Sequence, residues 1–530
     1  MFLLLTLALL AAQNTLAQQP CAQIATALRL PKIEIRSAQL HPARQAAANA
    51  PAAPDRCVVQ ATARPTSDSE ILIEIWLPAN NWNGKYLQSG NGGWAGAIPL
   101  GALAHGANRG YATAATDNGH KAPGPDTSPA VWAVGHPEKL IDFGHRALQQ
   151  TTLVAKAVIE VFYGRPANRS YFVGCSDGGR EALMEAQRYP EDFDGIIAGA
   201  PANDWTRLLT GFVWNQQALA SAPIPPAKLP AIQNAVFAAC DKNDAVADGL
   251  IENPASCKFN PEVLACKNNQ DSDTCLTPNQ ITTLRRIYEG PRHPETRAQI
   301  FPGYPPGHEA TPGEWAPWII PTANNPTSIQ AGFGNSFYGQ AVFERANWDF
   351  KTFNFDTDLK LALEKAAPAT DSTSPDLRTF RAHGGKLIQY HGWADAAISP
   401  YSSINYYEKV RTFLATFPTK EESSSKIEDF YRLYMVPGMG HCAGGYGPNS
   451  FGQGIGKAKQ DPEHDAILAL ERWVEQGIAP EELIATGITG IQVNGKPQPI
   501  TRPLCVYPKV ATYSGSGDPH QAQSFACKVP

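Results

Sequence analysis

A serine lies between two glycines in the segment Gly174-Cys175-Ser176-Asp177-Gly178. The apolar residues before this segment are typical of a strand, and "GREALMEAQRYP" after it is typical of a helix. In that setting, a G-x-S-x-G pentapeptide predicts a sharp turn that presents Ser176 Oγ as a nucleophile at the carboxyl edge of a sheet. The pentapeptide alone is weak evidence, because glycine and serine are common in loops. Ser176 is therefore a candidate nucleophile that needs two partners.

Those partners are a base and an acid, because a serine hydroxyl attacks only when a base takes its proton and an acid orients that base. With this type of turn the acid and then the histidine follow the serine. Asp395 in "LIQYHGWADAAIS" and His441 in "YRLYMVPGMGHCAGG" fit that order, although Asp395 also suits a helix N-cap and His441 a loop. His391 competes as the base but precedes the acid, and Asp177 competes as the acid but would point away from the serine. We predict the triad Ser176, Asp395 and His441.

Strand and helix patterns alternate around these residues, which predicts a parallel sheet with helices on its faces. The strands are expected within residues 71–78, 85–96, 110–120, 170–174, 193–201, 384–399 and 429–445, and the helices within 142–164, 179–190, from 400 onward and 462–476. Asn494-Gly495 suggests a hairpin turn. The pattern breaks between 203 and 376, a region rich in proline, asparagine and tryptophan. We therefore predict an α/β catalytic domain over 18–202 and 377–530, interrupted by an inserted domain over 203–376.

The bulk composition is that of a globular protein, with 530 residues, 43% hydrophobic and 18% charged. The net charge of −5 and the lack of a basic stripe give nucleic-acid binding no electrostatic basis. The apolar run Phe2–Ala12 is too short to span a bilayer, and Thr15-Leu16-Ala17 suits signal peptidase. This predicts a signal peptide over 1–17 and a secreted or periplasmic protein with no membrane span after cleavage. The basic residues that usually begin a signal peptide are missing, and a hydrophobic first helix is the alternative.

The chain has ten cysteines, and an even number behind an export signal predicts disulfides. None of them forms a C-x-x-C pair, which disfavours zinc ribbons and thioredoxin-like redox sites. The count alone does not give the pairing.

Cys175-Ser176, Asp395 and His441-Cys442 together resemble the CS–D–HC pattern of the tannase and feruloyl esterase family, which also includes mono-hydroxyethyl terephthalate hydrolases. The segments "GCSDGGREALMEAQRYPEDFDGIIAGAPA", "HGWADAAISP", "VPGMGHCAGG" and "ALERWVEQGIAPEELIAT" are similar to those of its members, so the likeness covers nearly the whole mature chain. The resemblance implies an α/β-hydrolase core with a large inserted lid. It also implies a Cys175–Cys442 disulfide that joins the serine and histidine loops. The other pairs that it implies are Cys21–Cys57, Cys240–Cys257, Cys266–Cys275 and Cys505–Cys527.

The oxyanion hole is expected to use backbone N–H groups. One comes from Asp177, next to the nucleophile, and the second from Gly93 or Gly92 in the loop "GNGGWAG". Aromatic residues of the lid are expected to hold a planar acyl group, and of these we assign Phe333 and Phe337 to substrate binding. The other lid aromatics considered are Trp205, Trp214, Trp315, Trp318 and Tyr338.

The segment "CDKNDAVADGLIENPASC" crowds Asp241, Asp244 and Asp248 into one loop, where they repel one another unless a cation is bound. The loop is not an EF-hand, because Val246 stands where that motif has glycine. It resembles the calcium site in the family's lid, which implies ligation by the three carboxylates and by the carbonyl oxygens of Val246 and Leu250. The alternative is a solvated, aspartate-rich turn.

The sequence therefore predicts an exported, calcium-bound serine esterase that hydrolyses small aromatic esters through an acyl-enzyme. Terephthalate monoester hydrolases of the family carry an arginine just before the lid's Gly-Phe pair. The absence of such an arginine before Gly332-Phe333 favours an uncharged phenolic acyl group. A feruloyl esterase is favoured over a tannase or a terephthalate monoester hydrolase. The interpretation from another class is a non-catalytic, calcium-stabilised protein that binds phenolic compounds, and a peptidase on the same fold is a third possibility.

Overall fold

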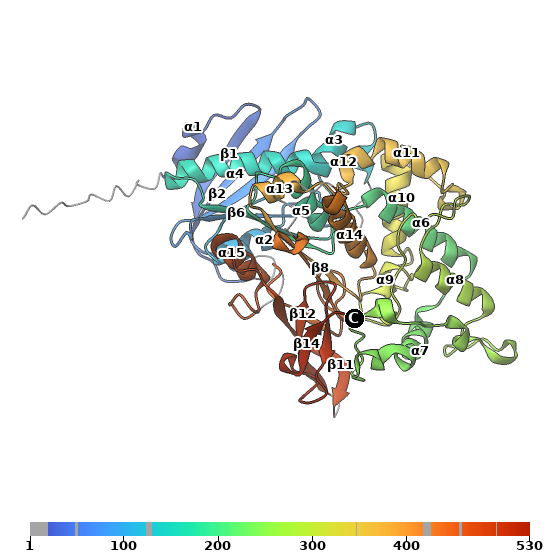
Figure 1. Ribbon diagram of the computed structural model, residues 1–530. Coiled ribbons are helices and arrows are strands. Elements are labelled where there is room, and N and C mark those ends of the chain that lie inside the picture. The colour runs from blue at the N-terminus through green and yellow to red at the C-terminus, as the bar shows by residue number, and fades with distance from the viewer. Residues whose placement is uncertain are drawn as a thin grey trace, which may run out of the picture.

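The computed structural model describes residues 20–47, 51–122, 130–345, 347–416, 426–454, 458–493 and 496–530 (Figure 1). The predicted signal peptide, 1–17, lies outside the described residues. Within them, no helix combines the length and the apolar character needed to cross a bilayer.

A nine-stranded sheet forms the centre of the fold, in the order β1-β2-β3-β5-β4-β6-β7-β8-β9. The strands from β5 to β9 run parallel to their neighbours, whereas β1, β2 and β3 pair antiparallel with one another and β3 pairs antiparallel with β5. This arrangement confirms the predicted α/β-hydrolase core. The strands are β1 Ile33–His41, β2 Arg56–Ala63, β3 Ile71–Pro78, β4 Lys85–Ser89, β5 Ala112–Thr116, β6 Arg169–Cys175, β7 Gly195–Gly199, β8 Lys386–Gly392 and β9 Tyr431–Val436.

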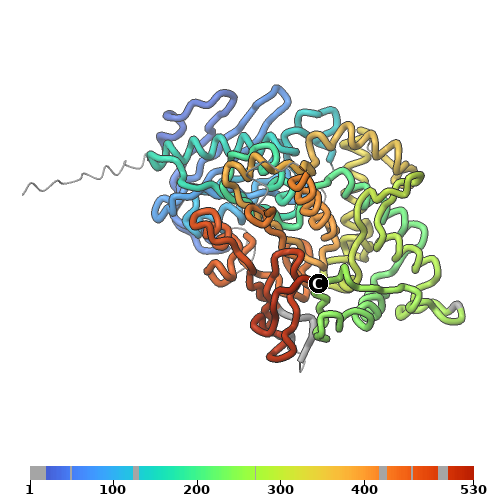
Figure 2. The backbone as a smooth tube through the Cα atoms, viewed as in Figure 1, coloured from blue at the N-terminus to red at the C-terminus, as the bar shows by residue number. Residues whose placement is uncertain are grey.

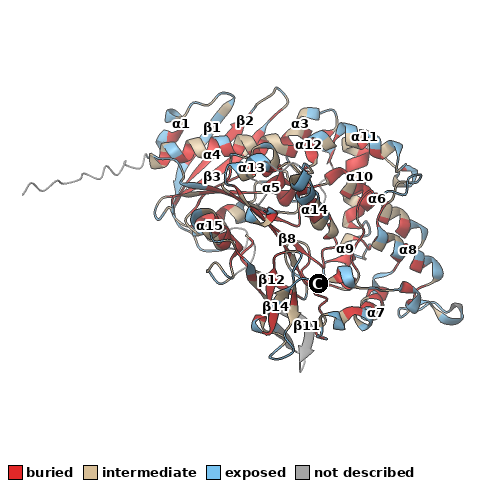
Figure 3. Ribbon diagram, viewed as in Figure 1, coloured by how far each residue is buried: buried red, intermediate tan, exposed pale blue. Residues whose placement is uncertain are grey.

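Helices cover both faces of the sheet, so its strands other than the edge strand β1 are largely buried on two sides (Figure 3). One face packs against α4 (Ala147–Tyr163), α5 (Asp177–Arg188) and α14 (Tyr401–Thr416), and the other against α2 (Leu100–Asn108) and α15 (Ala466–Gln476). Shorter helices are α1 Ile24–Ala27, α3 Pro137–Ile141 and α13 Arg378–Ala382.

The chain between β7 and β8 leaves the sheet and forms a helical body, which we call the insert (residues 203–376). Figure 2 shows it in green and yellow beside the sheet. Two apolar clusters of its own hold it together and also join it to the core. Its helices are α6 Trp205–Ser221, α7 Leu229–Cys240, α8 Pro278–Glu289, α9 Trp315–Trp318, α10 Ile329–Ser336, α11 Thr357–Lys365 and α12 Ala367–Thr370.

The C-terminal segment adds two small sheets, formed by β10 (Pro448–Ser450), β11 (Glu482–Val493) and β12 (Lys496–Cys505), and by β13 (Val510–Tyr513) and β14 (Phe525–Lys528). Strands β11 and β12 pair as an antiparallel hairpin, with Val493 opposite Lys496. The predicted turn residues, Asn494 and Gly495, lie outside the described residues.

Five disulfides cross-link the fold, and all ten cysteines take part in them. The pairs are those that the family resemblance implies: Cys21–Cys57, Cys175–Cys442, Cys240–Cys257, Cys266–Cys275 and Cys505–Cys527.

Removing the side chain of Ile388 should destabilise the core. Ile388 is fully buried in β8, between Ile197 of β7 and Arg432 of β9. Ile388→Ala should lower the free energy of unfolding by about 2–5 kcal/mol, because a cavity remains in the middle of the sheet. Thermal unfolding with the disulfides intact measures this as a lower Tm. Val263→Ala is the control, because Val263 is 70% exposed. Equal Tm values for the two variants would contradict the assigned packing.

Candidate active site

Ser176 lies at the sharp turn between β6 and α5 with φ +66° and ψ −123°, a strained conformation for a residue with a side chain. Close packing around the turn supports this conformation. A Cβ on Gly174 would lie 2.2 Å from the Gly178 carbonyl oxygen, and one on Gly178 would lie 2.7 Å from the Asn91 carbonyl oxygen. The two glycines of the pentapeptide therefore let strand, helix and neighbouring loop meet behind the serine, as the sequence motif predicts.

The predicted base and acid converge on this serine. His441 Nε2 lies 2.9 Å from Ser176 Oγ, and His441 Nδ1 lies 2.8 Å from Asp395 Oδ2. Asp395 follows β8 and His441 follows β9, so the three groups share the carboxyl edge of the sheet. Burial opposes the charged imidazole, yet the Asp395 carboxylate raises the pKa of His441 above its ordinary value. The arrangement can take a proton from Ser176 and stabilise the resulting imidazolium.

Asp395 is buried and hydrogen-bonded on both oxygens. Its Oδ1 accepts the N–H groups of Ala397 and Ile398, each at 2.8 Å. Its Oδ2 accepts His391 Nε2–H at 3.1 Å in addition to His441. Burial works against ionisation, but the charge of His441 and the hydrogen bonds from both histidines hold the pKa of Asp395 well below its usual range. The acid is therefore a carboxylate at neutral pH.

The two competing residues have other partners. His391 lies behind the acid and also bonds Ser403 Oγ through Nδ1 at 2.7 Å, so it orients Asp395 and does not reach Ser176. Asp177 points away from the serine, as expected, and pairs with the buried Arg180 guanidinium at 2.6 Å. Burial raises the pKa of Asp177, and Arg180 opposes that rise.

The glycine loop after β4 lies beside the nucleophile. The Asn91 carbonyl oxygen accepts the Gly178 N–H at 2.9 Å, and the Asn91 N–H donates to Glu181 Oε2 at 2.7 Å. Gly92 and Gly93 then follow along the wall of the same cavity as Ser176. Asp177 begins α5, so its N–H has no acceptor within the helix. The assignment of these N–H groups to an oxyanion hole stays a prediction.

The Cys175–Cys442 disulfide ties the two catalytic loops together. The cysteines are 267 positions apart in sequence, with Cα atoms 5.9 Å apart, and each is adjacent to a triad residue. This cross-link fixes the backbone of Ser176 relative to that of His441.

Ser176 and His441 open onto an apolar cavity of about 430 Å³ between the sheet edge and the insert. Trp318 packs edge-on against His441 with ring centroids 5.3 Å apart, and Phe333 stacks on Trp94 at 6.1 Å. None of the described residues that line the cavity is an aspartate, glutamate, lysine or arginine. The insert contributes Trp205, Leu208, Leu209, Phe212, Trp318 and Phe333 to the wall.

The structure leaves Phe333 as a candidate substrate-binding residue and contradicts the assignment of Phe337. Phe333 lines the cavity, whereas Phe337 is fully buried and packs behind Trp94. Helix α10 passes into a π-helical turn at Phe337–Val342, and both phenylalanine rings contact Trp94. Of the other aromatics considered, Trp205 and Trp318 line the cavity, whereas Trp214, Trp315 and Tyr338 do not.

The predicted calcium ligands occupy one disulfide-closed loop of the insert. Each aspartate already accepts a loop N–H: Asp241 from Gly249, Asp244 from Val246 and Asp248 from Leu250. Burial raises the pKa values of Asp241 and Asp244 to about 6, with repulsion from Asp248 contributing. Arg502 of β12 pairs with Asp248 Oδ2 at 2.5 Å and partly neutralises the loop. The oxygen donors suit calcium, but the carboxylate oxygens of the three aspartates do not all lie within 4.8 Å of one another.

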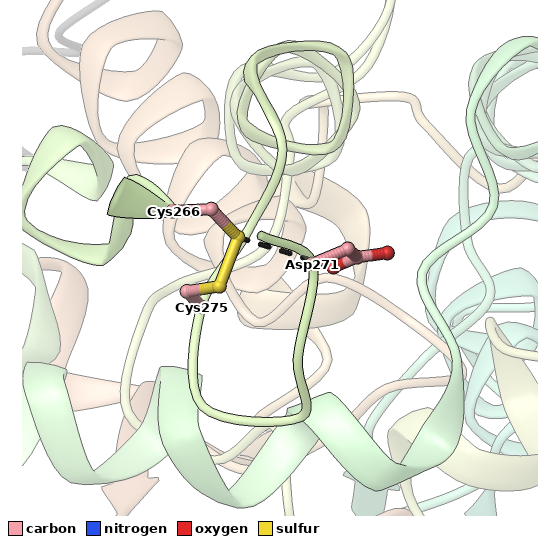
Figure 4. A group of neighbouring side chains, drawn as sticks. All are labelled: Cys266, Asp271 and Cys275. Atoms are coloured by element: carbon pink, nitrogen blue, oxygen red, sulfur yellow. Dashed lines mark hydrogen bonds between the residues drawn. A yellow bond between two sulfur atoms is a disulfide. The ribbon is translucent and has the colours of Figure 1, made fainter. Parts of the chain in front are cut away.

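Two other groups of side chains lie close enough for metal binding within the described part of the chain, with ligand atoms within 4.8 Å. The first is Cys266, Asp271 and Cys275, whose two sulfurs are joined as a disulfide (Figure 4). In the second, Asp461 with Glu463 and His464, Asp461 Oδ1 bonds His464 Nδ1 and accepts two backbone N–H groups. Neither group has a feature that points to a metal.

Removing the Cys175–Cys442 bond should slow the nucleophile. A double Cys175→Ala, Cys442→Ala variant should react with an organophosphonate about 100-fold more slowly, because a small misplacement of Ser176 relative to His441 costs that much. Stopped-flow or quenched labelling measures the second-order rate constant. The matched control is the double Cys266→Ala, Cys275→Ala variant, which removes a local disulfide of the insert and should react at the wild-type rate. Equal rates for the two double variants would refute the positioning role.

The chain resembles known esterases in sequence and in fold. The sequence profile described as tannase and feruloyl esterase matches residues 57–528. An uncharacterized esterase of Xanthomonas campestris pv. campestris is 42% identical over 550 aligned positions, which cover 99% of this chain and 94% of the relative. A probable feruloyl esterase of Arthroderma benhamiae is 34% identical, over 87% of this chain and 83% of the relative.

A solved structure gives the same result for the fold. The crystal structure of feruloyl esterase B from Aspergillus oryzae superimposes with a TM-score of 0.84 and 30% identity, over 96% of this chain and 99% of that chain. The profile match spans most of the chain, including the serine, acid and histidine loops. The chain therefore belongs to the tannase and feruloyl esterase family and is a carboxylic ester hydrolase.

Proposed function

We propose that this chain is an exported feruloyl esterase that hydrolyses esters of uncharged hydroxycinnamic acids. One observation carries the proposal: the hydrogen-bonded chain from Ser176 through His441 to Asp395 opens directly onto an apolar, aromatic cavity. The relatives named as feruloyl esterases support the choice of substrate class. The five disulfides support export, because such bonds persist in oxidising compartments.

The first half of the reaction forms an acyl-enzyme. His441 Nε2 takes the Ser176 hydroxyl proton as Oγ attacks the ester carbonyl carbon. The developing oxyanion accepts hydrogen bonds from the N–H of Asp177 and from that of Gly93 or Gly92. Asp395 stabilises the imidazolium. His441 then gives its proton to the leaving alkoxide, and the alcohol departs.

The second half reverses the roles with water. His441 takes a proton from a water molecule, whose oxygen attacks the acyl carbon. Collapse of the tetrahedral intermediate breaks the bond to Ser176 Oγ, which recovers its proton from His441. The products are the free aromatic acid and the resting enzyme.

The cavity wall favours an acyl group without a charge. A carboxylate on the acyl ring would be taken from water into a pocket whose described lining residues include no lysine or arginine. An unpaired buried charge is costly, so a terephthalate monoester fits less well than a phenolic acid ester. Phe333 and Trp318 present flat apolar surfaces to a planar acyl group.

We also propose that the insert binds calcium in the Cys240–Cys257 loop. Asp241, Asp244 and Asp248 would hold the ion through their carboxylates, with the carbonyl oxygens of Val246 and Leu250 completing the donor set. Calcium would supply charge neutralisation and stability to this loop. The raised pKa values of Asp241 and Asp244 support this proposal, since a cation would relieve the repulsion that contributes to them.

A substrate panel tests the proposed activity. We expect kcat/KM to be highest for methyl ferulate and lower for methyl gallate. Monomethyl terephthalate should have a kcat/KM at least about 100-fold below that of methyl 4-methylbenzoate, its uncharged counterpart, because its carboxylate stays unpaired.

Ser176→Ala is the control for background hydrolysis and should abolish turnover of every ester in the panel. Full activity in that variant, or organophosphonate labelling of another residue, would refute the mechanism. Equal kcat/KM for the charged and uncharged benzoates would refute the substrate argument. Ester binding without turnover by the wild-type chain would favour the non-catalytic alternative.

Calcium removal should destabilise the protein. Calcium at about 100 times its Kd adds roughly 2.7 kcal/mol to the free energy of unfolding, so chelation should lower the Tm and calcium should restore it. The effect should weaken as the pH falls through about 6, since protons compete for Asp241 and Asp244. Asp244→Ala should lose the response, whereas Asp461→Ala should keep it. A Tm that ignores chelation, with no metal found by elemental analysis, would contradict the proposal.

A further inference from the structure

A carboxylate of the insert lies against the backbone of both the acid loop and the base loop. Glu314 precedes α9 and is only 5% exposed. Its Oε1 accepts the backbone N–H of His441 at 3.0 Å, and its Oε2 accepts the backbone N–H of Ala396 at 3.0 Å. His441 is the base, and Ala396 directly follows the acid Asp395. A single side chain of the insert therefore bridges the two loops that carry the base and the acid.

The Glu314 carboxylate packs tightly against the loop that carries the base. A Cβ on Gly440 would lie 1.9 Å from Glu314 Oε1. The residue before the base must therefore lack a side chain for the carboxylate to reach the His441 N–H. In the described part of the chain, Glu314 forms no ion pair with a lysine or arginine, and its side-chain hydrogen bonds go to those two backbone N–H groups.

The acid loop is bonded to the insert at further points. Gln330 Nε2–H donates to the Ala396 carbonyl oxygen at 2.8 Å, so both polar groups of that residue's backbone bond to the insert. The Tyr304 hydroxyl donates to the Ala397 carbonyl oxygen at 3.2 Å. The next N–H groups along this loop are those that Asp395 Oδ1 accepts. The insert therefore fixes the loop conformation that places the acid.

Glu314 also affects the charge of the site. Burial and repulsion from Asp395 raise the pKa of Glu314 to about 7, against the opposing effects of its two N–H donors and of His441. When ionised, Glu314 raises the pKa of His441, in addition to the larger effect of Asp395. The other titratable groups around the acid are His391, bonded to Asp395, and the buried Tyr304 and Tyr390.

We propose that Glu314 is a positioning residue, through which the insert holds the catalytic acid and base in their working geometry. It acts through the backbone of His441 and of Ala396 and does not touch the reacting atoms. This inference rests on the proposed function, because it assigns a role relative to that triad.

Glu314→Gln tests the role with a side chain of nearly the same size. Glutamine has one oxygen, so only one of the two N–H groups keeps an acceptor and the other faces an amide NH₂. We expect kcat for methyl ferulate to fall by about 10- to 100-fold with KM nearly unchanged, because the base and the acid lose their alignment. The acidic limb of the kcat/KM profile should move to lower pH, because His441 loses a nearby negative charge and protonates less readily.

Glu309→Gln is the matched control. Glu309 is also a buried carboxylate of the insert, but its oxygen accepts from the Tyr288 hydroxyl and from the Gly307 N–H at 2.9 Å. This variant should keep the wild-type kcat and pH profile, whatever stability it loses. Active-site titration with an organophosphonate corrects both variants for any unfolded fraction.

The proposal is overturned if Glu314→Gln matches Glu309→Gln in kcat per titrated site and in pH profile. If Glu314→Gln does not fold, Gly440→Ala gives the second test, because its methyl group displaces the carboxylate without removing it. A similar loss of kcat is expected there, and a wild-type kcat would overturn the proposal. If the proposed function itself is wrong, the wild-type protein will show no more turnover than Ser176→Ala. That result is distinct from a failure of the Glu314 proposal, in which the wild type stays active.

Discussion

The active site depends on keeping one buried carboxylate charged. Asp395 is 2% exposed, and a buried anion is costly unless hydrogen bonds replace its lost water. Two imidazoles and two backbone N–H groups supply those bonds. Only an ionised Asp395 can hold His441 in the tautomer that leaves Nε2 free to take the serine proton. Much of the surrounding structure brings these donors to one carboxylate and keeps them there.

The sheet and one disulfide provide the rest of that placement. Parallel strands bring loops that are distant in sequence to one edge, where β6, β8 and β9 end, with β7 between β6 and β8. The strained backbone of Ser176 costs of order 1–3 kcal/mol, which close glycine packing behind the turn must offset. Cys175 and Cys442 then join the two loops covalently. The geometry therefore rests on backbone packing and a covalent bond as well as on side-chain hydrogen bonds.

Local signals explain what could be predicted from the sequence. The triad could be predicted because its signals are short-range. These signals are the strand–turn–helix pattern around Ser176 and the polar residues that follow two strands. Strands β1 and β2 were not predicted: β1 has only a short alternation of Ile33 and Ile35 with Glu34 and Arg36, and β2 is a short segment, RCVVQATA, without regular alternation. Phe333 and Phe337 are four residues apart and both contact Trp94, but only Phe333 reaches the cavity, a difference that helical spacing does not encode. Glu314 carries no signal, because its contact with His441 spans 127 residues in a region without periodicity.

The insert therefore does more than cover the cavity. Glu314 and Trp318 lie four residues apart, one bonded to the backbone of the base loop and the other packed against the ring of His441 in the cavity wall. One short helical segment thus contacts both the base and the space for the acyl group. Because protein interiors are close-packed, a substrate that shifts the Trp318 ring also presses on the segment that carries Glu314. The proposed role of Glu314 therefore predicts that acyl groups of the wrong shape are discriminated against in kcat as well as in binding.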